Sequence, residues 1–344
     1  MKGFVKISKY SGMREDLVQA GGGNSSFKLS EDKMAIKASG FQLADITETE
    51  GYALVNPQVI RDSFLGADNI DAFTDADSKT ILEAAFIEGK RPSIETFLHA
   101  ISGTYTLHTH PIVVNALTCR KNGMNVLRDL FPKALFVPYA TPGVELAKAY
   151  FKAYQEQTNG LDKVFDIVFL QNHGLVVSDD TADAVIEKTE IVLKTLEEYL
   201  KADYQGYHEL TEIWKLFEDR VVWKVTDENI LSIYKNRDGI WQHAFCPDCV
   251  VFLGKKLLEL PDRFGKQNID DFLLEHGQPV MVSHCGSLYL IADSVKKAME
   301  TQSVMSFSAQ VMKLNEGYEC NLLSDEEQKF LLNWDAEKYR KAMK

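Results

Sequence analysis

The feature that most constrains the fold is the repeated alternation of short apolar runs with helical patterns in the first part of the chain. Extended runs at 104–109 and 164–170 are followed by helical patterns, and in the most regular of these, 181–199, apolar residues recur at helical spacing. Runs at 24–29 and 34–38 flank a polar turn, which predicts a hairpin. This alternation lacks the glycine fingerprint of a dinucleotide-binding fold, so it predicts an α/β sandwich around a mixed sheet.

The length predicts a second part. The chain has 344 residues, and domains average roughly 150 residues. A polar and aromatic stretch over 206–240 is expected to connect a first domain, 1–205, to a smaller C-terminal α/β segment, 241–344. In that segment we expect strands at 250–254, 280–284 and 288–292 and helices at 294–314 and 325–343.

The composition narrows the function classes. Hydrophobic residues make up 45% and charged residues 26%, which excludes a disordered chain. The net charge of −12 argues against a nucleic-acid partner bound through a basic surface. The N-terminus lacks a signal peptide and no run reaches membrane-spanning length, so we expect a cytoplasmic protein with no membrane partner, whose five cysteines are reduced.

Three histidines predict a metal site. His108 and His110 lie two apart in an extended run, so both side chains project to one face. His173 ends another apolar run and precedes Gly174, where the chain can turn. Three imidazoles with a fourth position open are typical of catalytic zinc. The alternative is a pair of histidines on a polar strand face.

Glu95 is the candidate proton carrier. It precedes the histidine pair at the start of a short helical pattern, on the same face as Leu98 and His99. A carboxylate beside a zinc-bound carbonyl compound is what proton transfer to or from carbon requires. The alternative is a solvated glutamate at a helix start.

Two loops offer donors for an anion. Gly21 to Gly23 lead into Asn24 and Ser25, whose side chains and backbone N–H groups can contact a phosphate, and Ser39-Gly40 follows the next extended run. Lys28 and Lys37 could add positive charge. Each loop on its own is also compatible with an ordinary turn.

Six stretches, in order, resemble the class II aldolase/adducin family, which includes fuculose-phosphate and rhamnulose-phosphate aldolases. They run from Gly21 to Val177 and read GGGNSSFK, KASG, RPSIETFLHA, LHTHP, VPYATPG and QNHGLVV. The resemblance implies a three-layer α/β/α domain with a largely antiparallel central sheet, assembled as a homo-oligomer, with a tetramer favoured. The run HAFCPDCVVFLG is also similar to longer relatives in which the aldolase part precedes a dehydrogenase; this chain has no dehydrogenase glycine motif.

The resemblance carries site residues with it. It makes His108, His110 and His173 ligands of Zn²⁺ or another divalent metal, and Glu95 the catalytic acid/base. Tyr139 matches a tyrosine that a neighbouring subunit contributes to the active site. Positions that hold the substrate's phosphate in the family are occupied here by Asn24, Ser39, Gly40 and Ser93.

One position departs from the family pattern. Phosphate-binding members have two consecutive serines before the glutamate, and this chain has Ser93-Ile94. The lost hydroxyl weakens the case for a phosphorylated substrate, although Lys28 could compensate. A glutamate at position 95, where the related epimerases are expected to have an aspartate, argues against epimerisation.

These features predict a zinc-dependent aldolase. It would cleave a ketose 1-phosphate reversibly to dihydroxyacetone phosphate and an aldehyde in sugar catabolism. A second hypothesis is another metal-assisted reaction, namely decarboxylation or dehydration of a sugar-acid phosphate, or epimerisation. A third is an adducin-like binding module without chemistry, against which the complete histidine set and Glu95 argue.

Two further patterns leave alternatives open. Cys246 and Cys249, with His243, His284 and Cys285, would suit a second, structural zinc, but one Cys-x-x-Cys pair also fits ordinary reduced thiols. The segments 172–174 and 283–286 each lie between two apolar runs and precede a helix. They indicate either unrelated strand–turn–strand–helix units, which are common, or a degenerate duplication without a second His-x-His.

Overall fold

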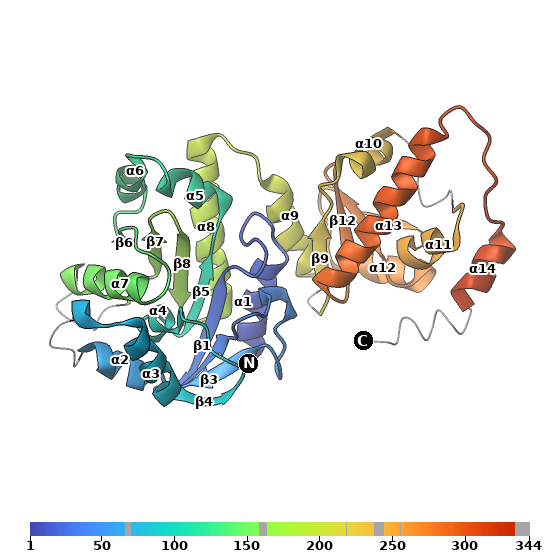
Figure 1. Ribbon diagram of the computed structural model, residues 1–344. Coiled ribbons are helices and arrows are strands. Elements are labelled where there is room, and N and C mark those ends of the chain that lie inside the picture. The colour runs from blue at the N-terminus through green and yellow to red at the C-terminus, as the bar shows by residue number, and fades with distance from the viewer. Residues whose placement is uncertain (66–69, 158–163, 218, 237–243, 255, 334–344) are drawn as a thin grey trace. The chain divides into compact units, whose positions relative to one another are not determined.

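The computed structural model describes residues 1–65, 70–157, 164–217, 219–236, 244–254 and 256–333. The chain divides into two compact units, Met1–Tyr204 and Gln205–Lys344 (Figure 1). None of the helices within these described ranges combines the length and apolar character needed to cross a membrane.

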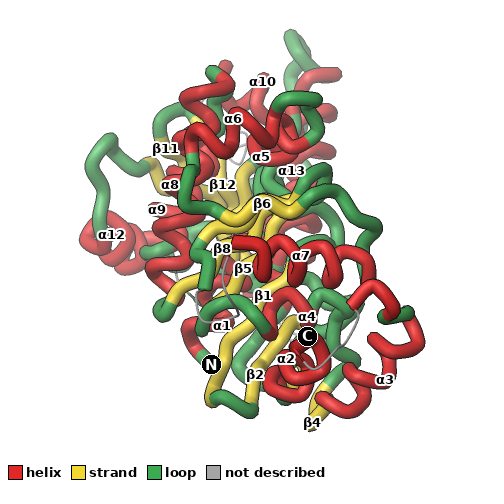
Figure 2. The backbone as a smooth tube through the Cα atoms, turned by 90° about the vertical axis from the view of Figure 1, so that its left-hand side faces the viewer, coloured by secondary structure: helices red, strands yellow, loops and turns green. Residues whose placement is uncertain are grey.

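The first unit is built on a sheet that, in its described residues, has eight strands in the order β4-β3-β2-β1-β5-β8-β7-β6 (Figure 2). Strands β6 and β7 pair in parallel, and the other neighbouring pairs are antiparallel. The strands are β1 Asn24–Ser30, β2 Lys33–Lys37, β3 Tyr52–Val55, β4 Phe86–Gly89, β5 Tyr105–Thr109, β6 Leu135–Val137, β7 Ile167–Leu170 and β8 Gly174–Asp179. The expected hairpin at β1 and β2 and the largely antiparallel sheet are confirmed.

Helices cover both faces of this sheet and give the expected three layers (Figure 1). One layer consists of α1 Lys2–Gly12, α5 Ile112–Thr118 and α8 Ala182–Leu200, with α6 Gly123–Leu130 packed on α5. The other consists of α2 Pro57–Leu65, α4 Thr96–Ala100 and α7 Val144–Gln157, with α3 Asp75–Ala85 packed on α2. On this second face Phe97, Tyr150 and Val176 belong to one buried apolar cluster.

The second unit is a smaller α/β body. Its described residues form a four-stranded sheet in the order β10-β11-β12-β9. Its strands are β9 Val221–Lys224, β10 Leu257–Glu259, β11 Met281–His284 and β12 Ser287–Ala292. Its helices are α9 Gln205–Trp214, α10 Glu228–Asn236, α11 Pro247–Leu253, α12 Lys266–His276, α13 Val295–Leu314 and α14 Asp325–Asn333.

Two expectations for this part differ from the structure. Residues 206–240, expected to connect two domains, supply α9, β9 and α10, and β9 pairs along β12. The strand expected at 250–254 is wrong, because these residues belong to helix α11 and its C-cap. Pro247 stands at the start of α11, and Cys249, Val250 and Leu253 are buried along it at helical spacing.

The strand order of the second unit repeats half of the first. The order β6-β7-β8-β5 corresponds to β10-β11-β12-β9, and in both sets the first pair is parallel and the next two are antiparallel. In both, the helix after the last hairpin strand packs on the two neighbouring strands: α8 on β8 and β5, and α13 on β12 and β9. We call β5 to α8 the first repeat and β9 to α13 the second repeat.

The correspondence extends to single residues. Thr181 and Ser294 each lie two residues after the hairpin strand, and each side chain caps the following helix. His108 pairs with Val176, the third residue of β8, and Lys224 pairs with the third residue of β12. Lys224 therefore occupies the position of His108. This agreement favours the duplication over two unrelated units.

Candidate metal centre

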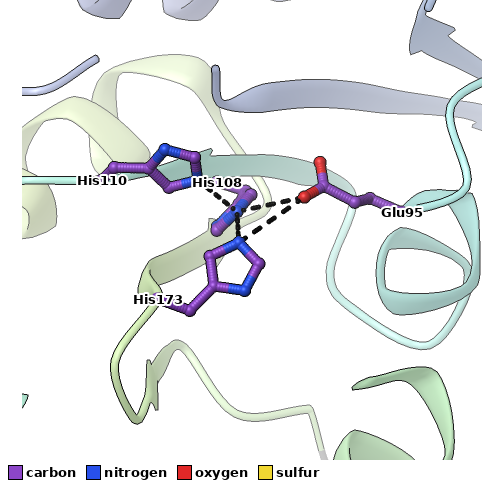
Figure 3. Close-up of side chains that lie close together, drawn as sticks. All are labelled: Glu95, His108, His110 and His173. Carbon is purple, nitrogen blue, oxygen red and sulfur yellow. Dashed lines mark hydrogen bonds and ion pairs between the residues drawn. The ribbon is translucent and has the colours of Figure 1, made fainter. Parts of the chain in front are cut away.

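The three predicted histidines meet at one end of the first repeat. His108 lies on β5, His110 follows the last residue of that strand, and His173 lies in the turn between β7 and β8 (Figure 3). Nε2 of His108 lies 3.1 Å from Nε2 of His110 and 3.3 Å from Nε2 of His173. We call these residues, together with Glu95, the histidine cluster.

The donor set and spacing suit a tetrahedral metal ion. Nitrogen ligands at about 2.0–2.1 Å from such an ion are separated from one another by roughly 3.3–3.4 Å, close to the distances between the Nε2 atoms. Three imidazole lone pairs directed at one point repel one another unless a cation lies between them. The three histidines therefore fit the zinc ion that the sequence predicts.

A backbone carbonyl on the far side of the His108 ring determines which ring nitrogen carries the proton. Its Nδ1 lies 3.0 Å from the carbonyl oxygen of Leu175, which makes Nδ1 the donor and leaves the lone pair of Nε2 directed into the cluster. A backbone carbonyl behind a ligating imidazole is the usual arrangement at metal sites. Burial, and after it the neighbouring rings, lower the pKa of His110 to about 3 and of His173 to about 4, so these two rings are neutral. Burial also acts to lower the pKa of His108, but the carboxylate of Glu95 outweighs it and raises that pKa in the metal-free protein.

Glu95 precedes α4 and points at the same spot (Figure 3). Its Oε1 lies 3.4 Å from Nε2 of His108 and 3.8 Å from Nε2 of His173. Its Oε2 accepts a hydrogen bond of 3.2 Å from the side-chain amide of Asn24. Burial alone would raise the pKa of Glu95, but His108 and Asn24 outweigh it and hold that pKa well below its usual range.

Close backbone approach builds the cluster and explains two glycines. A Cβ on Gly174 would lie 2.3 Å from the carbonyl oxygen of Thr109 and 3.0 Å from the His110 ring. A Cβ on Gly22 would lie 3.0 Å from Nδ1 of His110. These positions exclude side chains because two segments converge on His110. Gly22 thus serves packing at the histidines, a role that the sequence did not suggest.

A buried ion network supports the same loop. The guanidinium of Arg14 bonds both carboxylate oxygens of Asp16, at 3.0 and 2.6 Å, and also contacts Glu190. The carbonyl oxygens of Asp16 and Leu17 accept hydrogen bonds from the backbone N–H groups of Ile112 and His110. The network therefore holds the backbone around His110 in place.

Three of the predicted phosphate-binding residues lie together beside Glu95. The backbone N–H of Ser39 donates to the carbonyl oxygen of Arg91 at 2.9 Å. The hydroxyl oxygen of Ser93 accepts from the backbone N–H of Glu95 at 3.3 Å. Ser39 and Gly40 are exposed, and open space surrounds Gly40. The 39–40 loop and Ser93 thus border an accessible surface next to the histidine cluster.

The other predicted anion contacts are directed elsewhere. The buried hydroxyl of Ser25 lies 2.7 Å from that of Ser8 on α1, because neighbouring strand residues face opposite sides of the sheet. The ammonium of Lys28 donates to the carbonyl oxygen of Ser102, and burial lowers its pKa to about 8. The structure does not bring Ser25 or Lys28 to the cluster, and Asn24 reaches it only through Glu95.

Sequence reasoning gave no role to His99 and only a general charge to Lys37. The ammonium of Lys37 donates to the carbonyl oxygen of Phe41 at 2.8 Å and ties the 37–41 loop, while burial lowers its pKa. His99 is fully buried; its Nδ1 lies 2.7 Å from the Ser26 hydroxyl, and its Nε2 has no partner among the described residues. His99 follows Glu95 by four residues, and this helical spacing was the signal in the sequence that the two residues lie on one face of the helix.

Tyr139 lies at the surface, beside the segment that precedes His173. Its side chain is 61% exposed, and its backbone N–H donates to the side chain of Gln171 at 3.2 Å.

The residues of the second predicted zinc group do not all lie together. Cys246 and Cys249 lie with their sulfur atoms 3.4 Å apart, His284 and Cys285 belong to a different cluster, and His243 falls outside the described residues.

The fold and cluster together define a three-layer α/β protein with a histidine-rich centre at one end of its sheet. Residues 4–200 match the family described as Class II Aldolase and Adducin N-terminal domain. The match spans more than half of the chain, and the chain belongs to the class II aldolase and adducin family.

Individual relatives match about 60% of this chain. The uncharacterized oxidoreductase YuxG of Bacillus subtilis (strain 168) is 28% identical over 223 residues, 60% of this chain, and the chain spans 30% of that relative's length. The N-terminal class II aldolase domain of a protein from Thermoplasma acidophilum is 25% identical, covers 58% of this chain and 92% of its own, with a TM-score of 0.49. An L-fuculose 1-phosphate aldolase from Thermus thermophilus is 19% identical, covers 61% and 95%, with a TM-score of 0.35.

Proposed function

We propose that this protein is a zinc-dependent lyase that cleaves a ketose 1-phosphate reversibly to dihydroxyacetone phosphate and an aldehyde, in the sugar metabolism of the cytoplasm. The observation that carries the proposal is the convergence of three imidazoles and a carboxylate. Nε2 of His108 lies 3.1 Å from Nε2 of His110, 3.3 Å from Nε2 of His173 and 3.4 Å from Oε1 of Glu95. A binding module has no need of three imidazoles directed at one point beside an ionised glutamate.

The ligand histidines and Glu95 divide the chemistry. A zinc ion held by His108, His110 and His173 would supply Lewis-acid polarisation of the substrate's carbonyl and hydroxyl oxygens. Glu95 is ionised at neutral pH because its pKa is held low, so it is ready to accept a proton. In the cleavage direction Glu95 accepts the proton of the substrate's hydroxyl group as the carbon–carbon bond breaks, and it then gives that proton to the nucleophilic carbon of the ketone fragment. Asn24 holds the carboxylate in place.

The remaining site residues are proposed from the family resemblance and their placement. Ser39, Gly40 and Ser93 border an accessible surface beside Glu95, which supports a role in holding the phosphate. Tyr139 is largely exposed, which suits a side chain that serves a neighbouring subunit of a homo-oligomer, with a tetramer favoured. The first unit is proposed as the catalytic domain.

The test is a retro-aldol screen of ketose 1-phosphates with the zinc-loaded protein, coupled to detection of dihydroxyacetone phosphate. We expect cleavage of at least one sugar by the wild type. Glu95→Gln should lower kcat on the order of 10²–10⁴-fold while zinc stays bound, since it removes the proton carrier and not a histidine ligand. His108→Ala should abolish both turnover and zinc at this cluster.

Control reactions separate the competing activities. Sugar-acid phosphates are incubated in parallel, with release of carbon dioxide and loss of water as readouts. Carbon dioxide release without any aldol cleavage would replace the proposed reaction by a decarboxylation. A zinc-loaded protein that turns over none of these compounds, in which Glu95→Gln changes nothing, would support the binding-module alternative.

A further inference from the structure

The second repeat has a cluster of metal-ligating side chains of its own. Glu209 comes from α9, His284 ends β11 and Cys285 follows in the turn to β12. One ligand atom from each lies within 4.8 Å of the other two, and Sγ of Cys285 is 3.3 Å from Nε2 of His284. We call these three residues the Cys285 cluster.

His284 is oriented as His108 is in the first repeat. Its Nδ1 lies 3.4 Å from the carbonyl oxygen of Leu260, so Nδ1 is the donor and Nε2 faces Cys285. The ring of Phe264 packs edge-on against the imidazole, with centroids 4.8 Å apart, and the histidine is buried. A buried imidazole fixed from behind, with its free nitrogen next to a thiol, is preorganised to bind a cation.

The cluster also occupies the matching place in the repeat. The hydroxyl of Tyr289 lies 3.0 Å from Oε2 of Glu209 and so holds this carboxylate over β12. Tyr289 is the third residue of β12, as Val176, the partner of His108, is the third residue of β8. Cys285, with φ of +46°, takes the left-handed place in its turn that Asn172, with φ of +54°, takes in the other.

We propose that Glu209, His284 and Cys285 bind one thiophilic divalent cation, with Zn²⁺ as the best match, independently of the histidine cluster. Thiolate, imidazole and carboxylate are the ligand types that zinc accepts, and in a tetrahedral site sulfur and nitrogen ligands are about 3.5 Å apart, near the observed 3.3 Å. The sulfur selects against Mg²⁺ and Ca²⁺. Cys285 is exposed, so the ion enters from solvent, displaces the thiol proton into it, and keeps a fourth position for water or a ligand.

Cobalt substitution tests the proposal directly. A thiolate bound to Co²⁺ gives a charge-transfer band in the near ultraviolet, whereas the histidine cluster contributes only nitrogen and oxygen donors and gives none. The full chain, stripped of metal and kept reduced with a phosphine, is titrated with CoCl₂. We expect a saturable charge-transfer band that corresponds to one sulfur-bound Co²⁺ per chain, and Zn²⁺ should displace it.

Variants assign the band. Cys285→Asn removes the thiol and keeps a residue that tolerates the left-handed turn, so the fold is retained. We expect it to lose the band and one equivalent of bound metal, and Glu209→Gln to weaken Co²⁺ binding by roughly tenfold or more. The matched control is Cys246→Ser with Cys249→Ser, which should keep the band.

Two results would overturn the proposal. One is a wild-type titration without a thiolate band; the other is a band that survives Cys285→Asn and disappears in the Cys246 and Cys249 double variant, which would move the ion to that pair. His108→Ala should leave the band unchanged. Failure of this proposal therefore leaves the proposed aldolase activity untouched, and the reverse also holds.

Discussion

The two repeats have the same strand order and the same capped helix, yet their turns carry different side chains. In the first repeat β5 contributes His108, the residue just after β5 is His110, and the turn adds His173. In the second, Lys224 stands at the position of His108, and its ammonium lies over the ring of Tyr207. There the ligand-type side chains come from the turn and from α9. The shared topology thus places a polar cluster beside the same turn in both repeats, while the element that faces the turn, β5 in the first repeat and α9 in the second, determines which donors join it.

The two repeats should differ most in their response to a substitution at the first strand residue after the turn, which is Gly174 in the first repeat. Gly174→Ala places a Cβ 2.3 Å from the carbonyl oxygen of Thr109, so β8 must move away from β5 and from the histidines. We expect loss of metal and turnover, and a decrease of about 1–3 kcal/mol in the free energy of unfolding. Metal analysis and urea denaturation measure both.

The control for Gly174 is its counterpart, Ser287, the first residue of β12. Ser287→Ala adds no atom, because a Cβ is already present, and should change the free energy of unfolding by less than about 1 kcal/mol. Equal effects of the two substitutions would mean that the close approach at Gly174 is not what builds the histidine cluster.

Acid should weaken the first unit through His99. Burial lowers the pKa of folded His99 from 6.5 to about 3, so below pH 6.5 the unfolded chain takes up a proton that the folded chain does not. The contribution of this residue to stability is therefore complete above pH 6.5 and is lost as the pH falls towards 3. The expected slope is at most about 1.4 kcal/mol per pH unit.

His99→Leu isolates this contribution. In the metal-free protein, urea denaturation followed by circular dichroism should show a flatter dependence on pH below 6.5 than in the wild type. All four tryptophans, Trp214, Trp223, Trp241 and Trp334, come after the first unit in the sequence, so their fluorescence is the internal control and should not respond. An unchanged slope in the circular dichroism data would assign the acid response to other groups.

The smallest expected effects are at the helix caps and should be equal. The hydroxyl of Thr181 accepts from the N–H of Ala184, and that of Ser294 accepts from the N–H of Lys297, both at 3.2 Å. Thr181→Ala and Ser294→Ala should each cost about 1 kcal/mol. Only Ser294→Ala should shift the tryptophan transition. Thr181→Ser and Ser294→Thr, which keep the hydroxyl, should cost much less; a full loss in either would exclude capping as the cause.

Local patterns predicted what depends on local geometry. The two-residue spacing of His108 and His110 predicted a shared face, and the helical period predicted α8. The same two-residue rule implies that Asn24 and Ser25 cannot both reach the site, and Ser25 is indeed on the other face. The apolar run at 250–254 was too short for its period to distinguish a strand from a helix, and Pro247 settles it as a helix.

What depends on tertiary packing could not be read from the sequence. The amide of Asn24 bonds Glu95 only because β1 lies under α4, and Lys28 is engaged by a carbonyl that no motif marks. Glu209 is far from His284 in sequence, and the two meet because α9 packs on β9, which lies beside β12 and so one strand away from β11. The similarity between segments 172–174 and 283–286 was visible in the sequence. The observation that favours a duplication is the matching order of the four strands in each repeat.

The contacts between β1 and the α4 segment have a consequence for how the chain reaches its native pairing. Asn24, Ser26 and Lys28 alternate along the strand and meet Glu95, His99 and the carbonyl of Ser102 in turn. Sliding β1 by one residue would turn all three side chains to the opposite face, so Glu95 would lose its amide donor and His99 and the carbonyl oxygen of Ser102 would lose these partners. These alternating contacts therefore favour a single register of β1. The same register also positions the carboxylate of Glu95.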